Sequence, residues 1–247
     1  MRNLKGLACS IFALVLAACG GGGGGGGGST PAAVIDPNLT VPFQTAAANL
    51  VNNGINQNFT VTGWINNSTL ANPVPNTPIT GSGSLTIGPP STTTFNGAPA
   101  LQATEVIVGS ASANGQSIPL AGTANNFYDP SNYTKVGSVI NGETTFISPY
   151  TYPATVKAGS TGTLGSGTSG GGLTLTTTTT AYSVATDSAN SLLVTIVSTK
   201  NIDNGIAGTV QDQTVYRITT SGAISLVSEN VQQSSTGSVY ESLTFAF

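Results

Sequence analysis

From Phe59 to the C-terminus, the chain is dominated by short runs in which apolar side chains alternate with Thr or other small polar residues. In the first run, Phe59, Val61 and Ile65 fall on one face of an extended chain, and threonines fall on the other. The β-branched Thr and Val suit a pleated surface, and their stiff χ1 disfavours a helix. The connections between runs are too short for crossover helices. The sequence therefore predicts a mainly β domain built on an antiparallel sheet.

Turn residues divide this region into separate strands. Asn96-Gly97 is the strongest hairpin dipeptide, and Asn141-Gly142 and Ser221-Gly222 mark two further turns. The predicted strands cover residues 59–65, 81–88, 92–95, 100–109, 144–147, 173–184, 191–199, 209–219, 223–228 and 239–247. We expect the sheet to be twisted, and either curved into a half-barrel or folded into a sandwich.

The segment Phe43–Asn53 has the period of a helix instead. Its apolar residues recur at spacings of three and four and share one face: Ala46, Ala47, Leu50 and Val51. Gly54 stands where a glycine commonly ends a helix. We expect this one short helix to cover an end or a face of the sheet.

The N-terminus has the three parts of a secretory signal peptide. Arg2 and Lys5 precede an apolar run at residues 7–16, and the small residues Ala17 and Ala18 follow. The apolar run is too short for a stable transmembrane helix, which needs about 20 residues. The sequence therefore predicts export and removal of residues 1–18.

The end of this segment, Leu16-Ala17-Ala18-Cys19, resembles the lipobox of bacterial lipoproteins. The resemblance covers only these residues and the signal peptide. It implies that Cys19 receives a diacylglyceryl group and an N-acyl chain, and that membrane lipid is a partner of the mature protein. More than one acyl chain is what stable anchoring requires. The aspartate that favours inner-membrane retention is absent, because Gly20 follows Cys19, so the resemblance implies an outer-membrane location in the cell envelope.

A glycine run at residues 20–28 follows the lipobox, and such a segment behaves as a flexible coil. We therefore divide the chain into the signal peptide (1–18), the lipidated cysteine with its tether (19–41) and a β-rich domain (42–247). A second Gly/Ser cluster, at residues 158–172, is expected to be a loop or linker. The domain could contain two similar halves around it.

Composition argues against several partners and chemistries. Only 6% of residues are charged, and the mature chain would have four basic residues against nine acidic ones, so nucleic acid is a poor partner. The chain contains no histidine, which removes the usual base of a serine nucleophile and the usual zinc sites. Within the Gly/Ser cluster, residues 165–170 match a dinucleotide fingerprint and residues 167–171 a nucleophile elbow, but neither has the required structural context. We predict no metal site and no cofactor.

Paired carboxylates could still hydrolyse sugars without a histidine. Most aspartates lie in predicted turns: Asp129, Asp187, Asp203 and Asp212. Glu105 and Glu241 lie inside predicted strands instead, so one of them is expected to be partly buried against Arg217 or a lysine as a structural ion pair.

The sequence leaves three functions open. The leading hypothesis is a non-catalytic envelope lipoprotein that binds a glycan, a lipid or a protein, or is structural; a curved sheet with an apolar cavity would resemble the half-barrel lipoprotein carriers of the periplasm. The second is an adhesin-like sandwich with a filled core and exposed tyrosines: Tyr128, Tyr133, Tyr150 and Tyr152. The third, a carboxylate hydrolase, is the least favoured, and we expect the protein not to be an enzyme.

Overall fold

The computed structural model describes residues 36–66, 75–169, 175–203, 208–235 and 238–247. They form one helix and a set of antiparallel strands. The elements are β1 (Thr40–Val41), α2 (Phe43–Asn53), β2 (Ile55–Ile65), β3 (Thr77–Ile87), β4 (Ser91–Phe95), β5 (Ala98–Ala113), β6 (Gln116–Tyr128), β7 (Lys135–Ile140), β8 (Glu143–Ile147), β9 (Val156–Lys157), β10 (Thr161–Ser169), β11 (Leu175–Ser188), β12 (Ser191–Asp203), β13 (Gly208–Thr219), β14 (Ile224–Ser235) and β15 (Ser238–Ala246).

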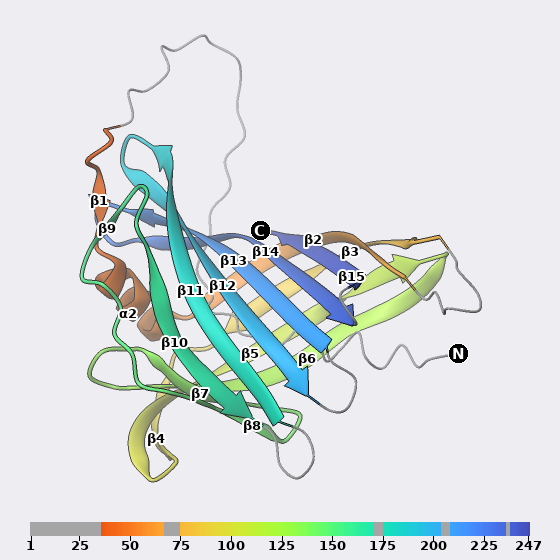
Figure 1. The fold of residues 1–247 in the computed structure, drawn as a ribbon, viewed down its shortest axis with the longest axis horizontal. Helices are drawn as coiled ribbons and strands as arrows, with labels where there is room; N and C mark the ends of the chain where they lie inside the picture. Colours follow the sequence, from red (N-terminus) through yellow and green to blue (C-terminus); the bar gives the residue numbers. More distant parts are fainter. Residues whose placement is uncertain (1–35, 67–74, 170–174, 204–207, 236–237) are drawn as a thin grey trace.

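The main sheet is closed into a barrel. Its strands follow the order β3-β2-β15-β14-β13-β12-β11-β10-β8-β7-β6-β5-β4, and β3 also pairs with β5. This extra pairing makes a twelve-stranded ring and leaves β4 outside it, at the lower left of Figure 1. The predicted mainly β, antiparallel fold with one short helix is confirmed. The structure differs from the expected half-barrel or sandwich in that the sheet closes on itself.

Glycines allow the closure between β3 and β5. Gly83 lies directly opposite Gly109 in this pairing. A Cβ atom on Gly83 would lie 2.6 Å from the carbonyl oxygen of Val108, and one on Gly109 would lie 2.5 Å from that of Ser82. Both are closer than real Cβ contacts. The two backbones can therefore approach this closely only because neither residue has a side chain. Glycine in a strand often marks such a close approach.

Side chains alternate between the interior and the outside of the barrel, as the period of two predicts. Along β12, Leu192, Val194 and Ile196 are buried. In β2, Phe59 and Val61 are buried, whereas the intervening threonines are exposed. The barrel interior is therefore the hydrophobic core. Its largest fully buried aliphatic side chains are Ile79, Leu85, Leu120, Leu164, Leu192, Ile218 and Leu243.

The helix covers one end of this core, beside the short β1–β9 pair (Figure 1). It spans the predicted residues, and Gly54 ends it with φ 68° while its N–H donates to the carbonyl of Leu50. The ring of Phe43 packs on Tyr152 and Tyr182, with centroid distances of 5.0 and 5.7 Å. The amide of Asn49 donates to the carbonyl oxygen of Gly222 at 3.0 Å. The expectation that the helix covers an end of the sheet is confirmed.

The predicted hairpin turns are also confirmed. Asn96 and Gly97 both have positive φ (50° and 78°), as a two-residue turn of this kind requires. A third such dipeptide, Asn114-Gly115 (φ 50° and 73°), joins β5 to β6. We did not predict that hairpin, although the dipeptide that signals it is present.

Part of the second Gly/Ser cluster is a strand and not the expected loop. Residues 161–169 form β10, which pairs with β11 on one side and with β8 on the other. The pairing is irregular between Thr163 and Ser166, where Gly165 adopts φ 101° beside the ring of Tyr150. Thr-rich β11 provides the partner that a glycine-rich strand needs. Two similar halves of the domain remain a hypothesis.

Replacing Gly83 by Val is expected to destabilise the fold, because its side chain would collide with the backbone of β5. Overpacking of this kind costs typically about 1–3 kcal/mol, and a backbone collision belongs at the upper end. Urea unfolding of the purified chain measures the change. Gly88→Ala is the control, since its Cβ would meet nothing nearer than 4.0 Å; equal stability of both variants would contradict the closure.

Candidate functional site

A cluster of ionisable side chains lies inside the barrel. Glu105, Lys135, Asp212 and Glu229 are each at most 2% exposed. Glu105 and Lys135 come from β5 and β7, and Asp212 and Glu229 come from β13 and β14. In the ring order these two groups of strands lie on opposite walls. The cluster therefore spans the core, and it is the strongest candidate site in the described part of the chain.

Glu105 is held by its neighbour on β6. Its Oε2 accepts a hydrogen bond of 2.9 Å from the amide nitrogen of Asn126, which is 1% exposed. Its Oε1 is buried and has no hydrogen-bond partner. Burial raises the pKa of Glu105 from 4.5 to about 7, although the positive charge of Lys135 and the bond from Asn126 act in the opposite direction. Glu105 therefore exchanges its proton close to neutral pH.

Lys135 is buried at the start of β7. Its backbone N–H donates to the hydroxyl of Tyr150 at 3.2 Å. Burial lowers the pKa of its ammonium group from 10.5 to about 8, and the negative charges of Glu105 and Asp212 oppose this shift. A substantial fraction of this lysine is therefore a neutral amine under mildly alkaline conditions.

The carboxyl groups on the opposite wall are also poorly solvated. Glu229 lies directly across from Thr214, two residues along β13 from Asp212. Thr214 Oγ1 donates to Asp212 Oδ1 at 3.3 Å, whereas Asp212 Oδ2 and Glu229 Oε1 are buried without partners. Burial raises the pKa of Asp212 well above 3.8 and that of Glu229 well above 4.5. The negative charge of Glu105 adds to both shifts, and that of Asp212 adds to the shift of Glu229. The cluster thus holds protons that exposed carboxyls would release.

Tyrosines extend this polar region toward the end covered by α2. Tyr150 and Tyr152 have hydroxyl oxygens 3.1 Å apart. Tyr152, Tyr128 and Tyr216 are at most 3% exposed, and burial raises the pKa of each. The expectation that Tyr128 and Tyr152 are exposed contact residues is therefore wrong. Tyr128, at the end of β6, and Tyr152, in the segment before β9, are buried in the core instead.

Glu241 is buried separately, on β15. It is 3% exposed and its Oε1 has no partner, and burial raises its pKa from 4.5 to about 7. Both singled-out glutamates therefore lie in the core, which exceeds the predicted partial burial. Lys135 is the positive charge that acts on Glu105, but among the described residues the two form no ion pair within 4.0 Å, so the predicted structural ion pair is not found. Arg217 faces outward and partners neither.

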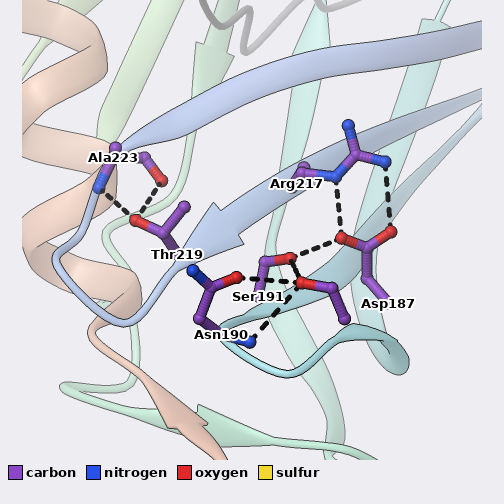
Figure 2. Close-up of polar contacts among 7 residues, drawn as sticks. Asp187, Asn190, Ser191, Arg217, Thr219 and Ala223 are labelled. Carbon is purple, nitrogen blue, oxygen red and sulfur yellow. Dashed lines mark hydrogen bonds and ion pairs between the residues drawn. The ribbon is translucent and has the colours of Figure 1, made fainter. Parts of the chain in front are cut away.

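Arg217 instead fastens the turn between β11 and β12 on the outer surface (Figure 2). Its Nε and Nη2 donate to the two carboxylate oxygens of Asp187, at 2.7 and 3.1 Å. Ser191 also donates to Asp187, at 2.5 Å. The bonds from Arg217, its charge and the bond from Ser191 keep the pKa of Asp187 below its usual value. This network organises a turn.

The outer surface has two further features. Phe95 of β4 stacks on Phe127 at 4.3 Å, touches Phe146 at 5.5 Å between ring centroids, and covers Gly137. Phe146 is 43% exposed. Separately, an open hollow of about 460 Å³ is lined by Asn58, Phe59, Thr60, Ser82, Gly83 and Ala246. It opens on the outer face of the sheet and not into the interior, where a carrier would hold its ligand.

The remaining predicted residues are placed as follows. Cys19 and the glycine run lie outside the described residues. Asp129 lies in a turn, as predicted, and accepts bonds from Ser131. Asp187 and Asp203 lie in the last residues of β11 and β12 and not in turns, so the prediction is wrong for both. It is also wrong for Asp212, which lies within β13 and is buried in the core. Among the described residues, no three Asp, Glu, Cys or His side chains are grouped as metal ligands.

Comparisons of the chain with protein families, curated proteins and solved structures find no match. Separately, the described part of the chain has no helix with the length and apolar character that crossing a membrane requires.

Glu241→Gln is expected to stabilise the barrel at pH 8 and to leave its stability unchanged below pH 4. The folded protein keeps a proton on Glu241 up to about pH 7, whereas the unfolded chain releases it near 4.5. The free energy of unfolding therefore falls as pH rises between these values, by at most about 3 kcal/mol for this shift. Urea unfolding from pH 4 to 8 measures the difference. Glu143→Gln, at an exposed glutamate, is the control; parallel profiles for wild type and Glu241→Gln would contradict a buried carboxyl.

Arg217→Met is expected to have a small effect, because the pair with Asp187 is partly exposed to solvent. Such pairs contribute typically about 0.2–1 kcal/mol. Thermal unfolding in low and high salt checks this, since salt should reduce the difference between variant and wild type. A salt-independent loss of several kcal/mol would show that Arg217 supports the core.

Proposed function

We propose that the chain is a bacterial envelope lipoprotein, anchored through an acylated Cys19, whose β-barrel acts without catalysis by presenting its outer surface. The observation that carries this proposal is the sequence Leu16-Ala17-Ala18-Cys19 at the end of a signal peptide, followed directly by a glycine run. A lipid anchor needs a spacer to hold a folded domain clear of the headgroups, and a glycine coil provides one.

The position of the first described residues is consistent with a tethered module. Asp36 leads into β1 and α2, at the end of the barrel that the helix covers. A tether attached there leaves the other end of the barrel farthest from the membrane. That distal end carries the turn Asn114-Gly115 and the start of β15, where Val239 and Tyr240 are 43% and 36% exposed. Partner contacts are expected at this end.

The filled interior favours surface binding over transport of a ligand. Carriers hold their cargo in a cavity, whereas a cluster of packed apolar side chains from most of the strands occupies the described core. The outward positions are rich in Thr, Ser and Asn. A hydrolase would need acidic side chains in an open cleft, but four of them are buried in the barrel interior: Glu105, Asp212, Glu229 and Glu241. An adhesin-like role is therefore the second candidate. Because the exposed tyrosine set differs from the one expected, its contacts would involve other residues.

Membrane fractionation and intact mass of wild type and Cys19→Ser test the anchor. We expect the wild type in the outer-membrane fraction, without residues 1–18 and with the mass of a triacylated cysteine. Cys19→Ser should be released or left unprocessed. Cys9→Ala is the matched control, because Cys9 lies in the signal peptide and its loss should change neither fraction nor mature mass. An unmodified wild type outside the membrane fraction would overturn the proposal.

A further inference from the structure

The polar cluster contains a lysine, an amide and a carboxyl group that are buried together on neighbouring strands. Lys135, Asn126 and Glu105 are 2%, 1% and 1% exposed. They lie on β7, β6 and β5, which are consecutive in the barrel wall. Burying a charged lysine is expensive unless it is closely paired. Among the described residues, however, Lys135 has no ion pair within 4.0 Å. Stability alone does not account for this arrangement.

The strand register places the lysine beside the amide. Lys135 is directly opposite Tyr128, and Asn126 is two residues before Tyr128 on the same inward face of β6, diagonally across from Lys135 past a register shift between Phe127 and Tyr128. Diagonal neighbours on one face of a sheet are about 7–8 Å apart, within reach of long side chains. The four-carbon stem of lysine can therefore bring Nζ to the carboxamide carbon of Asn126 without moving either strand.

The two carboxyl oxygens of Glu105 differ in their contacts, because one is bonded to Asn126 and the other is free. Its Oε2 lies 2.9 Å from the nitrogen of the Asn126 amide, which is the atom that would have to leave as ammonia. Its Oε1 is buried and unpartnered, and Lys135 is the positive charge that acts on the carboxyl group. One carboxyl group thus bonds the leaving amine with one oxygen and keeps the other free to take a proton from the lysine when its Nζ attacks.

We propose that Lys135 and Asn126 condense into an intramolecular isopeptide bond, with Glu105 as the catalytic acid–base group. The neutral Nζ of Lys135 attacks the carboxamide carbon of Asn126, Glu105 accepts a proton from the new ammonium, and the same carboxyl protonates the departing nitrogen. The C–N bond to Nδ2 breaks as the bond to Nζ forms, one ammonia is released, and Glu105 returns to its starting state. No oxidant or cofactor is needed.

The environment supports each role. Lys135 must lose its proton to attack, and burial brings its pKa down to about 8. Glu105 must both accept and donate a proton, and its pKa of about 7 suits both tasks near neutral pH. The product is a neutral amide, so the bond removes the cost of a buried cation.

Acid cleavage of the full chain tests the proposal directly. Asp36-Pro37 and Asp129-Pro130 are acid-labile Asp–Pro bonds, and the second lies between Asn126 and Lys135. Cleavage in hot dilute acid should release fragments 37–129 and 130–247 from an unlinked chain. We expect the wild type to keep these two fragments joined on a denaturing gel, with a mass lower by one ammonia than an uncrosslinked pair.

Glu105→Gln and Asn126→Ala should both give separate fragments whose masses show no loss of ammonia. Circular dichroism should show that both variants remain folded. Glu241→Gln is the matched control, because it makes the same change at a buried carboxyl outside the cluster and should leave the fragments joined. Separate wild-type fragments would overturn the proposal. A 130–247 fragment lighter by one water would also overturn it, since this would show a bond from Lys135 to Asp212 instead. Joined fragments in folded Glu105→Gln would contradict the role of Glu105.

Discussion

The closure between β3 and β5 is the constraint on which the rest of the structure depends. It requires the glycine pair Gly83–Gly109, because any side chain there would collide with the opposing backbone. Once the ring is closed, inward side chains have no route to water except through the barrel ends, and α2 covers one of these. The same closure therefore produces the apolar core and isolates the charges inside it.

Those isolated charges determine the chemistry of the interior. Glu105 and Asp212 act on a single lysine, Lys135, and Glu229 is affected by both of these carboxyls. Burial is the largest influence on the pKa of all four groups. The pair of Arg217 and Asp187 on the outside contrasts with this cluster, because solvent screens its charges and limits its contribution to about 1 kcal/mol. The titration behaviour of the protein near neutral pH is therefore governed by the inside of the barrel.

Local patterns in the sequence were sufficient for the elements but not for their closure. The helix at Phe43–Asn53 and the hairpin at Asn96-Gly97 follow from spacing and turn chemistry, and both were predicted. Glu105 was also singled out as a candidate for burial, because it lies inside a predicted strand. Asp212 was missed because its run, Gln211-Asp-Gln213, is polar throughout, so nothing local shows which face is buried. Closure was missed because it depends on a meeting of β3 and β5, for which no short motif exists.

Hydrogen exchange along β3 and β5 tests the closed barrel most directly. In a closed ring the amides that pair these strands, such as those between Leu85 and Ile107, are as well bonded as amides in the middle of the sheet. The account predicts that peptides from Thr77–Ile87 and Ala98–Ala113 exchange as slowly as those from β12 and β13. Fast exchange confined to β3 and to the facing edge of β5 would show two open edges, and would contradict the closed barrel and the isolated interior that follows from it.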